Sequence, residues 1–265
     1  MSGFSHDQNL SGDPDAGDSA PPEAAQRAGN DLVQSFLAVR RGLGLLGYVL
    51  PIALIFYGLF VPQWALASIS AYFYSPMREL FVGTLCAQAV FLWNYEGYRP
   101  NAGEFLSDKA VSRIASFGAL VVAFAPLQPG IKTAPPAGEA LAPPFEPTFL
   151  QTIISPVYVE MMHGAGAALF FGALAVYCLV NFVRGDDSRP TKKAENRIYR
   201  CCGWIIVGCM AGYAALKLSG FEETATRMRA VFWLECIACA AFATSWAVKG
   251  EALRPLVRSM VAKSD

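Results

Sequence analysis

Several apolar stretches, each close to the length that crosses a lipid bilayer, alternate with charged segments along this chain of 265 residues. A helix needs about 20 apolar residues to span the hydrocarbon layer. Six stretches approach that length, at roughly 42–61, 79–98, 110–126, 161–183, 201–219 and 229–248. Charged residues make up only 16% of the chain, against about 25% in a typical soluble domain. The sequence therefore predicts an all-α polytopic membrane protein, a bundle of six transmembrane helices.

Basic residues indicate how such a bundle is oriented. Sixteen of the 21 Lys and Arg residues lie in four segments that six crossings place on one side, namely 1–41, 99–113, 184–200 and 249–265. Cytoplasmic loops of membrane proteins carry the excess of Lys and Arg. We therefore expect both termini in the cytoplasm of a multi-pass protein of the cell inner membrane. The formal net charge of zero gives no basic field that would attract nucleic acid.

Composition divides the chain into three parts. Residues 1–35 are rich in Asp, Ser, Gly, Pro and Ala and are expected to form a disordered acidic tail. Residues 36–250 form the expected six-helix transmembrane domain, and 251–265 a cytoplasmic C-terminal tail. The Pro-rich loop at 127–160 is expected to lack regular structure over most of its length and to act as a linker or as a lid.

Small residues recur at helical spacing in two of the expected spans. Gly164, Ala168 and Gly172 lie four residues apart, as do Gly208 and Gly212. Such stripes let helix backbones approach closely within lipid. We expect these two helices to face one another or a common neighbour.

Polar groups gather near the outer ends of the expected spans. Polar residues inside apolar spans are costly and often functional. Glu235 lies about one and a half turns inside the last span, with Arg78, Lys217 and Arg229 as candidate ion-pair partners that would fix helix register. The expected ligand-binding set, which would bind a small polar or lipid ligand, is Ser68, Ser70, Tyr72, Arg78, Glu160, His163 and Glu235.

His163 is the one histidine outside the N-terminal tail. It is a candidate general base, with Ser70 as the candidate nucleophile beside it. The alternative is an interfacial histidine that only forms a structural hydrogen bond. We expect no metal site and no cofactor, and the seven cysteines, which lie in or at the ends of apolar stretches, are expected to pack as small hydrophobic residues.

Several stretches resemble a bacterial multi-pass membrane protein family of unknown function. They are Ser68-Ile-Ser70-Ala-Tyr72-Phe-Tyr74, Arg78-Glu79-Leu-Phe-Val-Gly83, Asn196-Arg197-Ile-Tyr199-Arg200, Phe232-Trp233-Leu-Glu235 and Ser245-Trp246-Ala-Val-Lys249-Gly250-Glu251. The chain is more remotely similar to the membrane hydrolase superfamily of alkaline ceramidases and progestin/adiponectin-type receptors. Members of that superfamily have seven spans and a zinc site with three histidines, which this chain cannot build from His163.

Three functions remain open from the sequence. The first is a membrane protein that binds a small polar or lipid ligand at the outer leaflet. The second is a metal-independent lipid hydrolase that uses Ser70, His163 and Arg78. The third is a transporter, although no inverted repeat is evident. Ligand identity, enzymatic activity and oligomeric state are not determined by these patterns.

The charge distribution makes a topological prediction. A fluorescent reporter that matures only in the cytoplasm should fluoresce when it is fused to either terminus. An alkaline phosphatase fusion, which is active only outside the inner membrane, should be inactive at both positions. Phosphatase activity at either end would contradict an even number of crossings with cytoplasmic termini.

Overall fold

The structure is a computed structural model, and it describes residues 22–61, 65–97, 106–128, 148–184 and 189–262. These residues contain helices and no β-strand. The elements, in chain order, are α1 (Pro22–Phe60), the 3₁₀-helix η2 (Ser70–Tyr74), α2 (Arg78–Trp93), α3 (Asp108–Phe124), α4 (Phe149–Ile153), α5 (Pro156–Val176), the π-helical turn η4 (Tyr177–Asn181), α6 (Pro190–Leu218), α7 (Glu222–Arg227), α8 (Ala230–Lys249) and α9 (Arg254–Ala262). The all-α prediction is confirmed.

Four helical segments of the described chain are long and apolar enough to cross a membrane. They are Val33–Phe60, Pro156–Asn181, Pro190–Leu218 and Ala230–Lys249. The other two expected spans correspond to α2 and α3, which have 16 and 17 residues. Both fall short of the ~20 residues that a straight crossing needs. The membrane character of the chain is thus confirmed on four helices.

The chain divides into two units, Met1–Phe36 and Leu37–Asp265. Helix α1 begins at Pro22, so residues 22–35 of the expected disordered tail are helical. Pro at the first helical position followed by Glu, Ala, Ala and Gln favours helix, and the acidic, Pro-rich composition of the whole tail obscured this local signal. The expected C-terminal tail at 251–265 contains α9, which packs against α6.

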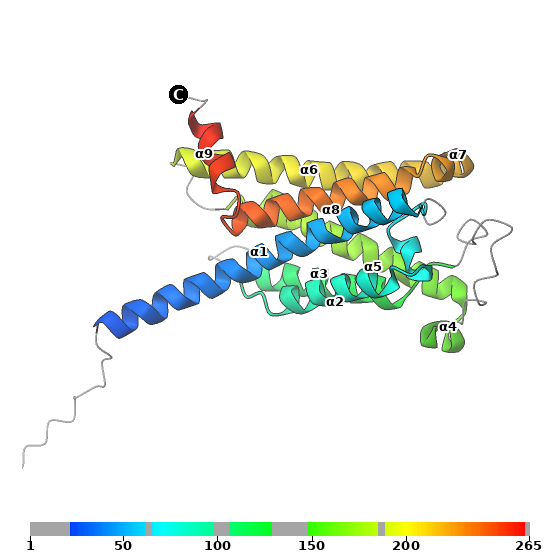
Figure 1. Cartoon of the computed structure of the whole chain (residues 1–265), viewed down its shortest axis with the longest axis horizontal. Helices are drawn as coiled ribbons and strands as arrows, with labels where there is room; N and C mark the ends of the chain where they lie inside the picture. The colour runs from blue at the N-terminus through cyan, green and yellow to red at the C-terminus, as the bar shows by residue number, and fades with distance from the viewer. Residues whose placement is uncertain (1–21, 62–64, 98–105, 129–147, 185–188, 263–265) are drawn as a thin grey trace, which may run out of the picture. The chain divides into compact units, whose positions relative to one another are not determined.

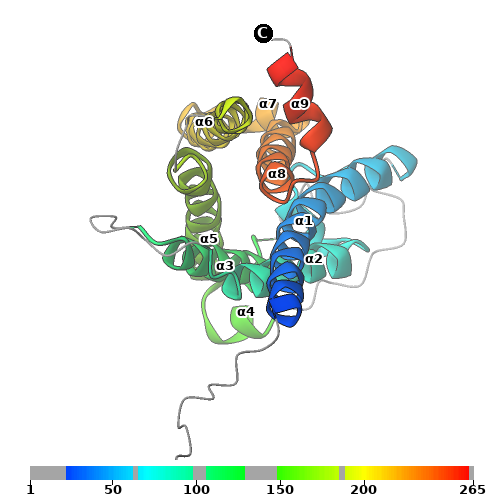
Figure 2. The same ribbon diagram turned by 90° about the vertical axis from the view of Figure 1, so that its left-hand side faces the viewer.

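Within the second unit the helices follow one another around a ring. Seen end-on, the order is α1, α2, α3, α5, α6 and α8 (Figure 2). Helix α3 packs between α2 and α5, and α6 packs between α5 and α8. Glycines bring α1 against α8, where Gly44 lies over the backbone of Ala243 and Ala247, and Figure 1 shows α6, α8 and α1 side by side.

The closest helix contact joins α3 and α5 through two glycines that the sequence stripes did not include. A Cβ atom at Gly118 would lie 2.6 Å from the backbone nitrogen of Phe170 and 2.7 Å from the carbonyl oxygen of Gly166. Backbones approach this closely only where no side chain intervenes. These glycines hold α5 against α3 and so set the position of His163 on α5.

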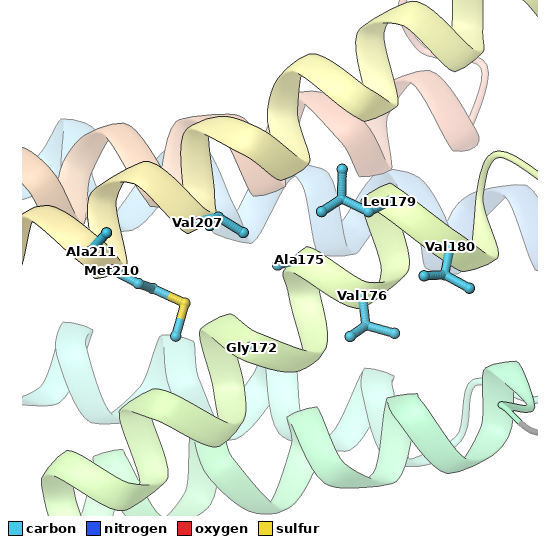
Figure 3. Close-up of a pocket in the computed structure, with 8 residues that line it drawn as sticks. All are labelled: Gly172, Ala175, Val176, Leu179, Val180, Val207, Met210 and Ala211. Atoms are coloured by element: carbon cyan, nitrogen blue, oxygen red, sulfur yellow. The ribbon is translucent and has the colours of Figure 1, made fainter.

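Helices α5 and α6 are neighbours, as expected, but the striped glycines do not make the contact. A Cβ at Gly164, Gly172 or Gly208 would meet nothing within 4 Å. Where α5 and α6 diverge they leave an apolar groove of about 540 Å³, shown in Figure 3 and lined by Gly172, Ala175, Val176, Leu179, Val180, Val207, Met210 and Ala211. The two helices are thus neighbours, as predicted, and of the striped glycines only Gly212 meets another helix, at 3.5 Å from the Leu234 side chain of α8.

The α3–α5 contact predicts that alanine substitutions at two glycines differ in their effect on protein stability. Gly118→Ala should destabilise the protein by about 1–3 kcal/mol, because its new methyl group meets backbone atoms that cannot move independently. Gly164→Ala, on the same pair of helices but in open space, is the matched control and should be neutral or slightly stabilising. Thermal unfolding of both variants in detergent measures the difference, and equal midpoints would contradict the close approach.

Candidate functional site

Residues 66–75, in the connection between α1 and α2, fold into the bundle and are mostly buried. All five residues of η2 are buried, from Ser70 to Tyr74. Three hydrogen bonds join main-chain groups of this connection to the start of α8. The carbonyl of Leu66 accepts from Arg229 Nε at 2.9 Å, the carbonyl of Ala67 accepts from the Phe232 amide at 2.9 Å, and the Ile69 amide donates to Glu235 Oε2 at 2.5 Å. We call residues 66–74 the docked segment.

Arg229 binds the docked segment through its side chain, and its own backbone is in the left-handed conformation. Its φ of 52° is uncommon for a residue other than glycine and costs about 1–3 kcal/mol. In this conformation its guanidinium lies 4.1 Å from the ring centroid of Phe232 and donates to the Tyr72 hydroxyl at 3.4 Å, besides the Leu66 carbonyl. The side chain is thus committed to the docked segment.

Ser70 and His163 come together inside the bundle. Ser70 Oγ lies 3.0 Å from His163 Nε2, and His163 Nδ1 lies 2.7 Å from the carbonyl oxygen of Ala125. A carbonyl oxygen can only accept, so the neutral imidazole carries its proton on Nδ1. Nε2 is then the acceptor for the Ser70 hydroxyl. This is the geometry of a serine next to a general base, with both side chains at least nine-tenths buried, 7% exposed for Ser70 and 5% for His163.

Glu235 makes no ion pair with any residue that the structure describes; its one hydrogen bond there comes from the Ile69 amide. The sequence offered Arg78, Lys217 and Arg229 as partners. Arg78 is exposed and lies 4.3 Å over the Phe73 ring, Lys217 is exposed on α6, and Arg229 binds the docked segment. The backbone amide of Ile69 thus takes the place of the expected cation.

A cavity of about 50 Å³ lies next to these groups in the middle of the ring. Apolar side chains form most of its wall, and its polar lining consists of Ser70, Gln88, Glu235 and Cys239. Gln88 is 4% exposed, and its amide makes no hydrogen bond among the described residues. A cavity needs about 10–15 Å³ to hold one water molecule, so this one has room for a few atoms.

The other predicted site residues lie away from the cavity. The Ser68 hydroxyl accepts from the Ala71 amide at 3.1 Å, and Tyr72 packs between Tyr57 and Phe232. Glu160 is half-buried near Tyr74. Burial raises the pKa of the Tyr74 phenol, and the charge of Glu160 adds to that rise while the Gln151 amide opposes it.

The predicted set of site residues therefore divides into two groups. Ser70 and Glu235 line the cavity, and His163 lies behind Ser70, to which it is hydrogen-bonded. Two of the other four, Ser68 and Tyr72, belong to the docked segment. The remaining two lie beside it, Arg78 over the Phe73 ring and Glu160 near Tyr74.

A second polar cluster, at the other end of the bundle, escaped the sequence analysis. Buried Asp108 accepts from Asn181 Nδ2 at 2.7 Å, and its backbone carbonyl accepts from the Tyr177 hydroxyl at 2.5 Å. Trp246 packs against aromatic rings there, including Tyr177 at 5.4 Å. Asn181 Oδ1 and Trp246 Nε1 have no hydrogen-bond partner within the described chain. The signal was available, since Asp108 and Asn181 flank apolar segments.

Comparisons with protein-family models, with curated proteins and with solved structures find no match for this chain. The described residues contain no group of three or more His, Cys, Asp or Glu side chains that would hold a metal ion.

The contacts of the docked segment predict that the guanidinium group of Arg229 stabilises the protein. Arg229→Lys keeps the charge but loses the planar donor group that reaches the Leu66 carbonyl and the Tyr72 hydroxyl, so it should destabilise the protein by about 1–2 kcal/mol. Arg227→Lys, at an exposed position two residues earlier, should change stability by less than ~0.5 kcal/mol. Thermal unfolding in detergent measures both, and an equal effect of the two variants would contradict the role.

Proposed function

We propose that the chain crosses the cell inner membrane six times, with α2 and α3 as the two short crossings and both termini in the cytoplasm. Helices of 16 and 17 residues reach about 24–26 Å at 1.5 Å per residue. Trp93 at the end of α2 and Arg113 near the start of α3 lie 5.2 Å apart, ring centroid to guanidinium. Such a pair suits the interface between lipid and water, and local thinning of the bilayer accommodates short spans.

We propose further that the protein binds a small polar ligand in the cavity beside Ser70 and Glu235. The observation that carries this proposal is the buried Gln88 amide, which lines the cavity without a hydrogen-bond partner among the described residues. Polar groups that line a buried cavity need hydrogen-bond partners within it. A bound polar ligand supplies such partners to the Gln88 amide and to the Glu235 carboxyl group.

The volume of the cavity favours a small ligand over a lipid. Pockets for drug-sized molecules measure about 300–1,000 Å³, whereas this cavity measures about 50 Å³. A lipid headgroup with its ester linkage does not fit within that space. Lipids then surround the helices as solvent, and the groove between α5 and α6 is an apolar surface they can cover.

A metal-independent lipid hydrolase is the second candidate, favoured by the 3.0 Å contact of Ser70 Oγ with His163 Nε2. In that mechanism His163 removes the hydroxyl proton and the Ala125 carbonyl orients the imidazole. Two features weigh against it. Both side chains are buried, and Arg78, the expected headgroup ligand, lies exposed over Phe73. Hydrolysis would need an opening that brings an ester to Ser70.

Ligand binding predicts a selective effect of Gln88. A small polar molecule that enters the cavity should raise the unfolding midpoint of the wild-type protein, because ligands that bind only the folded state stabilise it. Gln88→Leu, which keeps the size and removes the amide, should abolish that rise. The measurement is a thermal-shift screen of inorganic ions, amines, amides and small alcohols on protein in detergent.

Glu79→Gln is the control for this screen. It alters a carboxylate on the same helix, α2, at an exposed position, so it should keep the full response. The proposal fails if no small solute protects the wild-type protein, or if Gln88→Leu and Glu79→Gln respond alike.

A further inference from the structure

The Ser70 oxygen in the polar wall of the cavity can only accept further hydrogen bonds. The Ala125 carbonyl takes the Nδ1 proton of His163, which leaves Nε2 as the acceptor for the Ser70 proton. The Ser70 oxygen therefore faces any further neighbour with its lone pairs alone. Hydrogen bonds in such a chain polarise one another, which makes the Ser70 oxygen a stronger acceptor.

Glu235 adds a carboxyl group to this wall, which carries a negative charge when it is ionised. Its carboxylate accepts one hydrogen bond, from the Ile69 amide, and has no cationic partner among the described residues. The nearest basic residue along the chain, Arg229, donates to the Leu66 carbonyl and the Tyr72 hydroxyl. A carboxylate within a membrane-spanning helix needs a counter-charge or a proton.

The buried amide of Gln88 completes the wall. Its carbonyl oxygen is a neutral ligand of the kind that hard cations prefer. Gln88 lines one space of about 50 Å³ together with Ser70 and Glu235. An anion is disfavoured in that space, because it would face the Glu235 carboxylate and the Ser70 lone pairs with only the amide NH₂ group to donate.

We propose that the cavity binds one monovalent cation of about the size of Na⁺, held by the Glu235 carboxylate, Ser70 Oγ and the Gln88 carbonyl oxygen. This inference rests on the proposed binding function and names its ligand class. One carboxylate matches one positive charge, whereas divalent sites usually gather several carboxylates. Water molecules in the remaining space supply further oxygen ligands.

The test uses the full-length protein purified in detergent, with chloride salts exchanged at constant ionic strength. Against choline, which is too large for the cavity, Na⁺ should raise the unfolding midpoint saturably, by about 5 °C at 100 times the dissociation constant. Li⁺, K⁺ and NH₄⁺ form the other arms and rank the site by size and by hydrogen bonding. Binding of radioactive ²²Na⁺ gives an independent readout that does not depend on unfolding.

Two variants test the ligands. Glu235→Gln should lose the Na⁺ response and ²²Na⁺ binding, whereas Glu79→Gln should keep both. If Glu235→Gln does not fold, Gln88→Leu carries the test and should weaken Na⁺ binding at least tenfold, because it removes one neutral ligand and leaves the carboxylate bonded to Ile69.

The outcomes separate this inference from the binding function on which it rests. Equal unfolding midpoints of the wild-type protein in all five cations, together with no ²²Na⁺ binding, would overturn the cation site. If a neutral solute still protects the wild-type protein and fails to protect Gln88→Leu, the cavity binds a ligand and only the ligand class is wrong. If no solute protects, both proposals fail.

Discussion

The hydrogen bonds between residues 66–74 and the start of α8 are the interactions on which the rest of the site depends. Backbone that is not in a regular helix needs partners when it lies within a bundle surrounded by lipid. Here the Leu66 and Ala67 carbonyls and the Ile69 amide obtain them from Arg229, Phe232 and Glu235. The left-handed backbone of Arg229 is strain that these bonds offset.

Docking of this segment determines the chemistry of the cavity. It places Ser70 next to His163. It also places the Ile69 amide next to Glu235, which accepts a hydrogen bond from this backbone group instead of from a basic side chain. The result is a small buried space whose wall combines a carboxylate, a polarised hydroxyl oxygen and an amide. The distance between Ser70 and His163 resembles that between a catalytic serine and its base.

Close helix contacts set the positions of the helices around the site. The α3–α5 approach at Gly118 and Gly166 holds His163 against the Ala125 carbonyl, and contacts at Gly44 hold α1 against α8. Elsewhere small residues leave space, as in the apolar groove between α5 and α6. Glycine spacing alone does not separate these two outcomes, because the effect depends on what the facing helix presents.

The sequence by itself determined the class of this protein, and tertiary structure decided which of its polar groups meet. Apolar length and scarce charge were enough to predict an all-α membrane protein, and the expected spans at 42–61 and 229–248 end within a few residues of α1 and α8. The cost of polar groups in lipid also singled out Ser70, His163 and Glu235 from their positions along the chain.

The sequence could not show that Glu235 faces the Ile69 amide, that Arg78 lies outside the site, or that Gln88, midway along α2, lines the cavity. It also could not separate Gly118 from Gly164, since the two differ only in the neighbouring helix. The physical reason is that hydropathy and spacing record what each residue costs in lipid, whereas contacts across the bundle depend on how the helices and the docked segment pack in three dimensions.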